Sequence, residues 1–167
     1  MPTLATDPYV TSLEEVFWGG MLVAVTMVIH GFGMPAILRI QAALRSRFEP
    51  NPSFAAGIVI LILASWSILS VHLLEVIVWA GFFVWKGALP TKSVAYYFSL
   101  NEYTTVGSAY SLPPRWRLLE GMIAMAGLLT FAWSTGILFT LAQDFQAQQL
   151  DLQKRRREKR EAKARHK

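Results

Sequence analysis

The sequence predicts an all-α integral membrane protein with three membrane-spanning helices and a re-entrant helix and loop between the second and the third. Three observations predict this fold class. The chain of 167 residues is 53% hydrophobic, only 16% of its residues are charged, and the basic residues are concentrated in the C-terminal tail. Because a soluble domain of this size carries about a quarter charged residues, the composition favours a membrane environment.

Three apolar stretches are long enough to cross a bilayer, whose core of about 30 Å requires roughly 20 mostly apolar residues in a helix. The first covers residues 16–38, and it is too long for the apolar region of a secretory signal. The second covers residues 54–85, which exceeds one crossing, so we expect it to tilt or to project from the lipid. The third covers residues 118–141.

The basic residues predict the orientation of these spans. The connection between the first two spans holds three arginines and the tail holds nine lysines and arginines, whereas residues 86–117 hold four and the N-terminus none. Because cytoplasmic segments carry the excess of basic residues, the N-terminus and residues 86–117 are expected outside and the tail inside. Four tryptophans fall near the predicted outer interface, where amphipathic rings prefer to lie: Trp18, Trp79, Trp85 and Trp116.

The outer segment between the second and third spans is longer than a simple connection requires. Its first half, residues 93–103, has aromatic and apolar side chains at helical spacing, and Ser93 can cap this helix by accepting a hydrogen bond from a free backbone N–H. Thr-Thr-Val-Gly follows at residues 104–107. Non-helical backbone at membrane depth is tolerated only inside protein or beside a water-filled cavity. We therefore expect a re-entrant loop, with several subunits around an axis supplying the cavity.

The second span, the half-helix, the Thr-Thr-Val-Gly stretch and the third span together resemble the two-helix pore domain of potassium channels, a bacterial ion-channel family, over about residues 64–146. In that family the filter reads Thr-Val-Gly-Tyr-Gly, usually followed by Asp, and backbone carbonyls replace the hydration shell of the ion. The resemblance implies a pore helix and a homotetramer that conducts monovalent cations (K⁺ or Na⁺) passively. It places Thr104, Thr105, Val106 and Gly107 at the filter, where the Thr105 hydroxyl and nearby carbonyls would coordinate the ion.

The chain departs from the family pattern after Gly107. Ser108 and Ala109 stand where the family has Tyr-Gly, and Tyr110 stands where it has Asp. A left-handed backbone conformation, which the second glycine adopts freely, costs an alanine about 1–2 kcal/mol. The outer ion sites are therefore expected to be remodelled, with Ser108 at the outer end of the filter, and a less selective or non-conducting pore remains an alternative.

Two further residues near the loop are candidates for supporting it. Glu102 precedes the threonines, and it could brace the filter from behind, add negative field near the pore mouth, or pair with Arg115 or Arg117 at the outer surface. Tyr110 is the second candidate, at the outer end of the filter-like loop. The sequence leaves the alternatives for Glu102 open.

Ionisable residues within membrane spans are costly, so each is a candidate for function. His72 and Glu75 lie three residues apart and therefore on one helical face, His30 lies in the first span, and Glu120 begins the third. A dinuclear iron or manganese site requires several converging carboxylates. We therefore expect a hydrogen-bonded structural pair of His72 and Glu75 behind the pore helix, and neither a metal site nor a cofactor.

The sequence divides into three segments. Residues 1–53 are expected to form the extracytoplasmic N-terminus, the first span and a basic cytoplasmic loop, residues 54–146 the pore-domain-like unit, and residues 147–167 a basic tail that continues the third span as a helix. Basic residues near a bilayer surface attract anionic lipids by about 1 kcal/mol each. We expect this tail to bind anionic lipid rather than nucleic acid.

Two other classes of protein are weighed against the channel. The chain could be a non-conducting accessory subunit of a larger membrane complex, or a di-metal membrane enzyme built on His30, His72, Glu75 and Glu120. Neither a phosphate-binding loop nor a nucleophile triad is present in the sequence, and no enzymatic activity is expected. The absence of a targeting sequence and the compact chain favour a bacterial inner membrane, with the C-terminus cytoplasmic.

Overall fold

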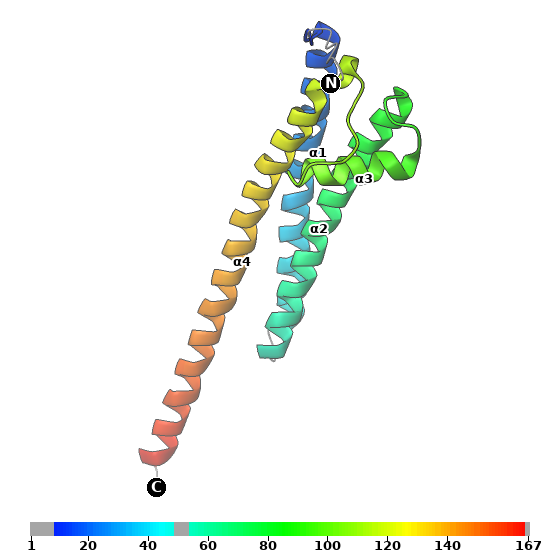
Figure 1. The fold of residues 1–167 in the computed structure, drawn as a ribbon. Coiled ribbons are helices and arrows are strands. Elements are labelled where there is room, and N and C mark those ends of the chain that lie inside the picture. Colours follow the sequence, from blue (N-terminus) through cyan, green and yellow to red (C-terminus); the bar gives the residue numbers. More distant parts are fainter. Residues whose placement is uncertain (1–8, 49–53, 166–167) are drawn as a thin grey trace, which may run out of the picture. The chain divides into compact units, whose positions relative to one another are not determined.

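A computed structural model describes residues 9–48 and 54–165 of the chain. The described residues form helices and connecting segments without a β-strand. In chain order (Figure 1), the elements are α1 (Leu13–Phe48), α2 (Phe54–Trp85), α3 (Lys92–Tyr103), the short 3₁₀ helix η1 (Pro114–Trp116) and α4 (Leu118–Arg165). The predicted all-helical fold class is therefore confirmed.

Three of the described helices, α1, α2 and α4, are long and apolar enough to cross a membrane. Their number and order agree with the three spans that the sequence predicts, and α2 has the predicted bounds at both ends. An apolar helix satisfies its backbone hydrogen bonds internally, which is the requirement for a segment in lipid. The length and apolar composition of these helices are compatible with a membrane protein.

The helix α1 extends further than predicted. Arg39, Arg45 and Arg47 were expected in a loop, but they lie within α1, which ends at Phe48. Residues 39–48 are rich in Arg, Ala, Leu and Gln, which favour helix, and lack both Gly and Pro. The connection to α2 falls on residues 49–53, which lie outside the described residues.

The start of α1 is fixed by a capping box. The Ser12 hydroxyl accepts a hydrogen bond from the Glu15 N–H (3.1 Å), while the Glu15 carboxylate accepts one from the Ser12 N–H (3.0 Å). This reciprocal pair satisfies two backbone donors that a helix start leaves free. Glu15 is fully buried and also accepts a hydrogen bond from the N–H of Leu118, the first residue of α4 (3.1 Å). One carboxylate thus stabilises the starts of both helices, where negative charge is favoured.

The start of α3 differs from the prediction at its cap. Thr91, in an extended conformation, is the N-cap residue, and its hydroxyl accepts a hydrogen bond from the N–H of Val94 at 3.2 Å. Ser93 lies inside the first turn and is not the cap. Lys92 already has a helical conformation, so the cap lies two residues earlier than predicted, while the end of the helix at Tyr103 agrees.

The chain forms two compact units, and α1, α2 and α4 contribute residues to both. The first unit comprises Met1–Gly33 and Ser70–Ala132, and the second comprises Met34–Leu69 and Trp133–Lys167. In the second unit, the Arg45 guanidinium donates hydrogen bonds to the Asp144 carboxylate and the Leu141 carbonyl, both at 3.3 Å. The rings of Phe54 and Phe145 pack with centroids 5.6 Å apart. The candidate site lies in the first unit.

Aromatic residues surround a cation in the first unit. The Lys86 ammonium lies over the rings of Trp18 (4.2 Å), Trp85 (4.5 Å) and Trp116 (5.6 Å), and 4.0 Å from the Glu14 carboxylate. Each such cation–π contact contributes about 0.5–1 kcal/mol at an exposed site. The three tryptophans that the sequence assigns to the outer interface thus gather around one lysine.

The fourth tryptophan of that predicted group has a different environment. Trp79 is fully buried, and its indole N–H donates a hydrogen bond to the Thr26 hydroxyl at 3.0 Å. A buried indole requires such a partner. Trp79 therefore belongs to the core between α1 and α2 rather than to the cluster around Lys86.

Candidate functional site

The loop after α3 begins with a helix-terminating turn. The N–H of Thr105 donates to the Glu102 carbonyl (3.0 Å), and the N–H of Val106 donates to the Asn101 carbonyl (3.0 Å). This pair of bonds is the Schellman pattern, in which one residue adopts the left-handed conformation. That residue is Thr105, with φ 61°, although a β-branched side chain is unfavourable there. Strain of this kind is concentrated at functional sites.

The next residue of the loop, Gly107, also has a positive φ, 81°, and its N–H donates to the Asn101 carbonyl at 3.3 Å. The amides of this stretch therefore turn back toward α3. Within residues 9–48 and 54–165, no hydrogen bond is donated to the carbonyl oxygens of residues 104–107. Val106 is 75% exposed, so the loop presents a surface that this chain does not cover.

Glu102 holds the outer end of this loop. Its carboxylate accepts a hydrogen bond from the N–H of Ser108 at 2.9 Å. Burial raises the pKa of Glu102 above its ordinary value of 4.5, the Ser108 N–H opposes the rise, and the charge of Glu120 adds to it. Arg115 instead pairs with Glu14 at 2.7 Å. Of the alternatives left open for Glu102, bracing the loop agrees with these contacts.

The other two predicted residues near the loop have local roles. The N–H of Tyr110 donates to the Ser108 hydroxyl (3.1 Å), and the Tyr110 ring meets the ring of Tyr97 edge to face, with centroids 6.1 Å apart. The Glu120 carboxylate accepts a hydrogen bond from the N–H of Leu112 at 2.7 Å. Glu120 therefore holds the segment that leads into α4.

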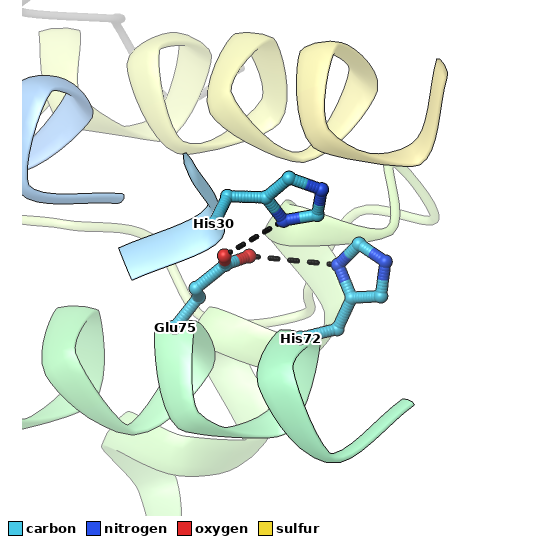
Figure 2. A group of neighbouring side chains, drawn as sticks. All are labelled: His30, His72 and Glu75. Carbon is cyan, nitrogen blue, oxygen red and sulfur yellow. Dashed lines mark hydrogen bonds and ion pairs between the residues drawn. The ribbon is translucent and has the colours of Figure 1, made fainter. Parts of the chain in front are cut away.

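The three remaining intramembrane residues meet in one buried cluster (Figure 2). A hydrogen bond of 3.0 Å joins His30 Nδ1 on α1 to one carboxylate oxygen of Glu75 on α2, and His72 Nδ1 lies 3.5 Å from the other oxygen. His30 and Glu75 are fully buried, and His72 is 5% exposed. An ionised Glu75 carboxylate only accepts hydrogen bonds, so it would pair with the Nδ1–H tautomer of His30. The local pair of His72 and Glu75 thus gains a partner from another helix.

Two residues of this cluster were not identified from the sequence. The Tyr103 hydroxyl, at the end of α3, donates a hydrogen bond to Glu75, lies 2.9 Å from His72 Nδ1 and lies 2.5 Å from the Thr130 hydroxyl of α4. The exposed fraction is 1% for Tyr103 and 0% for Thr130. A hydroxyl inside an apolar bundle requires a hydrogen-bond partner. A hydroxyl-bearing residue within an apolar stretch is therefore the sequence feature that could have identified both residues. Residues of three helices therefore meet at the Glu75 carboxylate, and Tyr103 links this carboxylate to Thr130 of α4.

The same end of α3 also touches the backbone of α4. A Cβ atom added at Gly127 would lie 1.9 Å from the Tyr103 carbonyl oxygen. Only a glycine allows this close approach of two backbones. Gly127 of α4 therefore lies directly against the end of α3.

The ligand-type atoms of His30, His72 and Glu75 lie within 4.8 Å of one another. Glu120 is not part of this group, since its carboxylate binds the Leu112 N–H. A dinuclear site on bundle helices requires carboxylates from several helices, and here a single carboxylate is available. Of the four residues weighed for a di-metal enzyme, His30, His72 and Glu75 are thus brought together and Glu120 is not.

Comparison with known proteins identifies no relative: no protein-family model, no curated protein and no solved structure matches the chain.

Proposed function

We propose that the chain is the subunit of a homotetrameric pore-loop protein that conducts monovalent cations, K⁺ or Na⁺, passively through a membrane. Thr104, Thr105, Val106 and Gly107 line the narrow part of the pore, and Ser108 forms its outer end. The observation that carries the proposal is the conformation of this loop, whose amides bond back to α3 while its carbonyls accept no hydrogen bond within the described chain.

The electrostatics of α3 support a cation at this position. The aligned peptides of a helix place about half a negative charge at its C-terminus. The helix α3 has 12 residues and ends at Tyr103, directly before the loop. Free carbonyls beside this end can replace the water molecules around a monovalent cation. A cation is therefore favoured beside residues 104–107, and an anion is not.

The outer end of the loop favours weak selectivity. Ser108 has no aromatic ring with which to hold the filter diameter, and Ala109 lacks the conformational freedom of glycine. The two substitutions also favour a second candidate function, a non-conducting accessory subunit of a larger membrane complex. In both cases the exposed basic tail contacts anionic lipid, the N-terminus lies outside, and a bacterial inner membrane is the proposed location.

The test is ion flux through the purified protein in liposomes under K⁺ and Na⁺ gradients. Gly107→Ala is compared with Gly87→Ala, because both glycines have a positive φ (81° and 64°) and an added Cβ meets no neighbour at either position. Both substitutions therefore cost a similar free energy, about 1–2 kcal/mol, but only Gly107 lies in the proposed pore.

Flux that is lost in Gly107→Ala and kept in Gly87→Ala supports conduction through this loop. A K⁺/Na⁺ flux ratio near one in the unmodified protein agrees with the remodelled outer sites. Absence of flux from an inserted tetramer contradicts conduction and leaves the accessory subunit. Flux with equal losses in both variants indicates a pathway elsewhere.

A further inference from the structure

Protein groups contact both oxygens of the Glu75 carboxylate. One oxygen lies 3.0 Å from His30 Nδ1, and the other accepts a hydrogen bond from the Tyr103 hydroxyl. Because the Tyr103 hydroxyl donates its hydrogen bond to Glu75, its oxygen is left to accept one from His72 Nδ1, which lies 2.9 Å away. Both oxygens of the carboxylate are therefore satisfied by protein donors, which a buried carboxylate requires. The cluster is a buried hydrogen-bond network that extends through Tyr103 to Thr130 of α4.

This network ends one peptide bond from the proposed pore lining. Tyr103 is the last residue of α3, and Thr104 follows it directly. The described loop bonds of Thr105, Val106 and Gly107 all return to α3, to the carbonyls of Glu102 and Asn101. The position of the loop therefore depends on where the end of α3 is held.

The side chain and the carbonyl of Tyr103 both hold that end. The Tyr103 hydroxyl is bound by Glu75 from α2 and contacts Thr130 from α4. The Tyr103 carbonyl lies against the backbone of α4 at Gly127. Since Glu75 also contacts His30, a chain of three side chains, His30, Glu75 and Tyr103, connects α1 to the loop.

We propose that Glu75 and His30 are positioning residues for the pore loop: they fix Tyr103, and through it the conformation of residues 104–107. In this arrangement α1 supports the loop and is more than a membrane anchor. The proposal rests on the proposed function for what the loop conducts, but the positioning itself concerns only the conformation of the loop.

The test compares Glu75→Gln and Tyr103→Phe with the control Trp79→Phe. The control removes another buried hydrogen bond between α1 and α2, that of Trp79 with Thr26 (3.0 Å), and the network around Glu75 does not use it. Hydrogen exchange of the Thr105 and Val106 amides in nanodiscs reports directly on the turn, because both amides are hydrogen-bonded there. Ion flux with K⁺ and Na⁺ is measured on the same samples.

We expect exchange at these two amides to be about tenfold faster in Glu75→Gln and Tyr103→Phe, the factor that corresponds to the loss of a buried hydrogen bond to a charged group. In Trp79→Phe we expect the exchange rate of the loop to be unchanged, although the protein as a whole is destabilised. Where the unmodified protein conducts, the K⁺/Na⁺ flux ratio should shift in the two network variants and stay constant in the control.

Unchanged exchange in both network variants overturns the proposal, and so does equal acceleration in all three variants, since that indicates a general loss of packing. If Glu75→Gln fails to insert, the exchange rates of Tyr103→Phe by themselves test the proposal, because this variant keeps the ring and removes only the hydroxyl. A protein that does not conduct but shows the selective acceleration contradicts the proposed function and retains the positioning role. A protein that conducts but shows no faster exchange in the network variants supports the proposed function and contradicts the positioning role.

Discussion

Substituting Gly127 by alanine tests the contact between α3 and α4 most directly. The added Cβ would lie 1.9 Å from the Tyr103 carbonyl oxygen, whereas ordinary contact begins at 3.4 Å. One of the two backbones must therefore move by about 1.5 Å. A backbone oxygen has no rotamer through which to escape, so the cost is that of overpacking, about 1–3 kcal/mol.

The matched control is Gly121→Ala, in the same helix, where an added Cβ meets no atom within 4 Å. Both variants gain the same preference of alanine for helix, about 0.5–1 kcal/mol, so the difference between them isolates the clash. Gly19→Ala provides a second comparison. Its Cβ would lie 2.1 Å from the Met122 sulfur, but this flexible side chain can turn away, and we expect a smaller cost.

The assay is unfolding in mixed micelles, followed by far-ultraviolet circular dichroism, with the free energies of unfolding of the three variants compared. We expect Gly127→Ala to be less stable than Gly121→Ala by about 1–3 kcal/mol. Equal stability of these two variants would refute the reasoning, because α4 would then not approach the end of α3 as closely as described.

Three further predictions follow from the contacts described above. Thr105→Gly should raise the free energy of unfolding by about 1 kcal/mol, because glycine adopts the left-handed conformation of Thr105 (φ 61°) without strain. Ala109→Gly is the control and should not raise it. A thermal unfolding series that ranks the two variants otherwise contradicts the assigned turn. Glu14→Gln should lower stability by less than about 1 kcal/mol, since its pair with Arg115 (2.7 Å) is exposed, and the effect should vanish in unfolding curves recorded at high salt. Added Zn²⁺ should leave the unfolding midpoint unchanged, because protein donors already satisfy Glu75; a stoichiometric rise in stability would identify a metal site instead.

The three spanning helices could be predicted from the sequence because the thickness of a bilayer sets the length of each apolar stretch. The bounds of α2 agree at both ends for this reason. The end of α1 at Phe48 was missed because helix propensity carries the helix beyond its apolar part. The capping box of Ser12 and Glu15 was also missed, although its spacing is visible in the sequence.

The site was predictable only where it is local. His72 and Glu75 lie one turn apart, and helix geometry alone places them on one face. His30 is 45 residues from Glu75 and Tyr103 is 28 residues away, so their meeting depends on how the helices pack, which the pattern of one helix does not specify. The conformation of the loop was likewise not predictable, because Thr105 adopts a backbone region that its residue type disfavours.

The buried carboxylate of Glu75 has a consequence for how the chain enters the membrane. A charge left without a partner in lipid is costly, so a helix carrying one inserts poorly alone. His30 lies on α1, which is synthesised before α2, and the two residues bond at 3.0 Å. The carboxylate can therefore find a partner as soon as α1 and α2 form a helical hairpin, before Tyr103 leaves the ribosome. Insertion of α1 and α2 as a pair, followed by docking of α3 and α4 onto a carboxylate that already has a hydrogen-bond partner, is the assembly order that this arrangement favours.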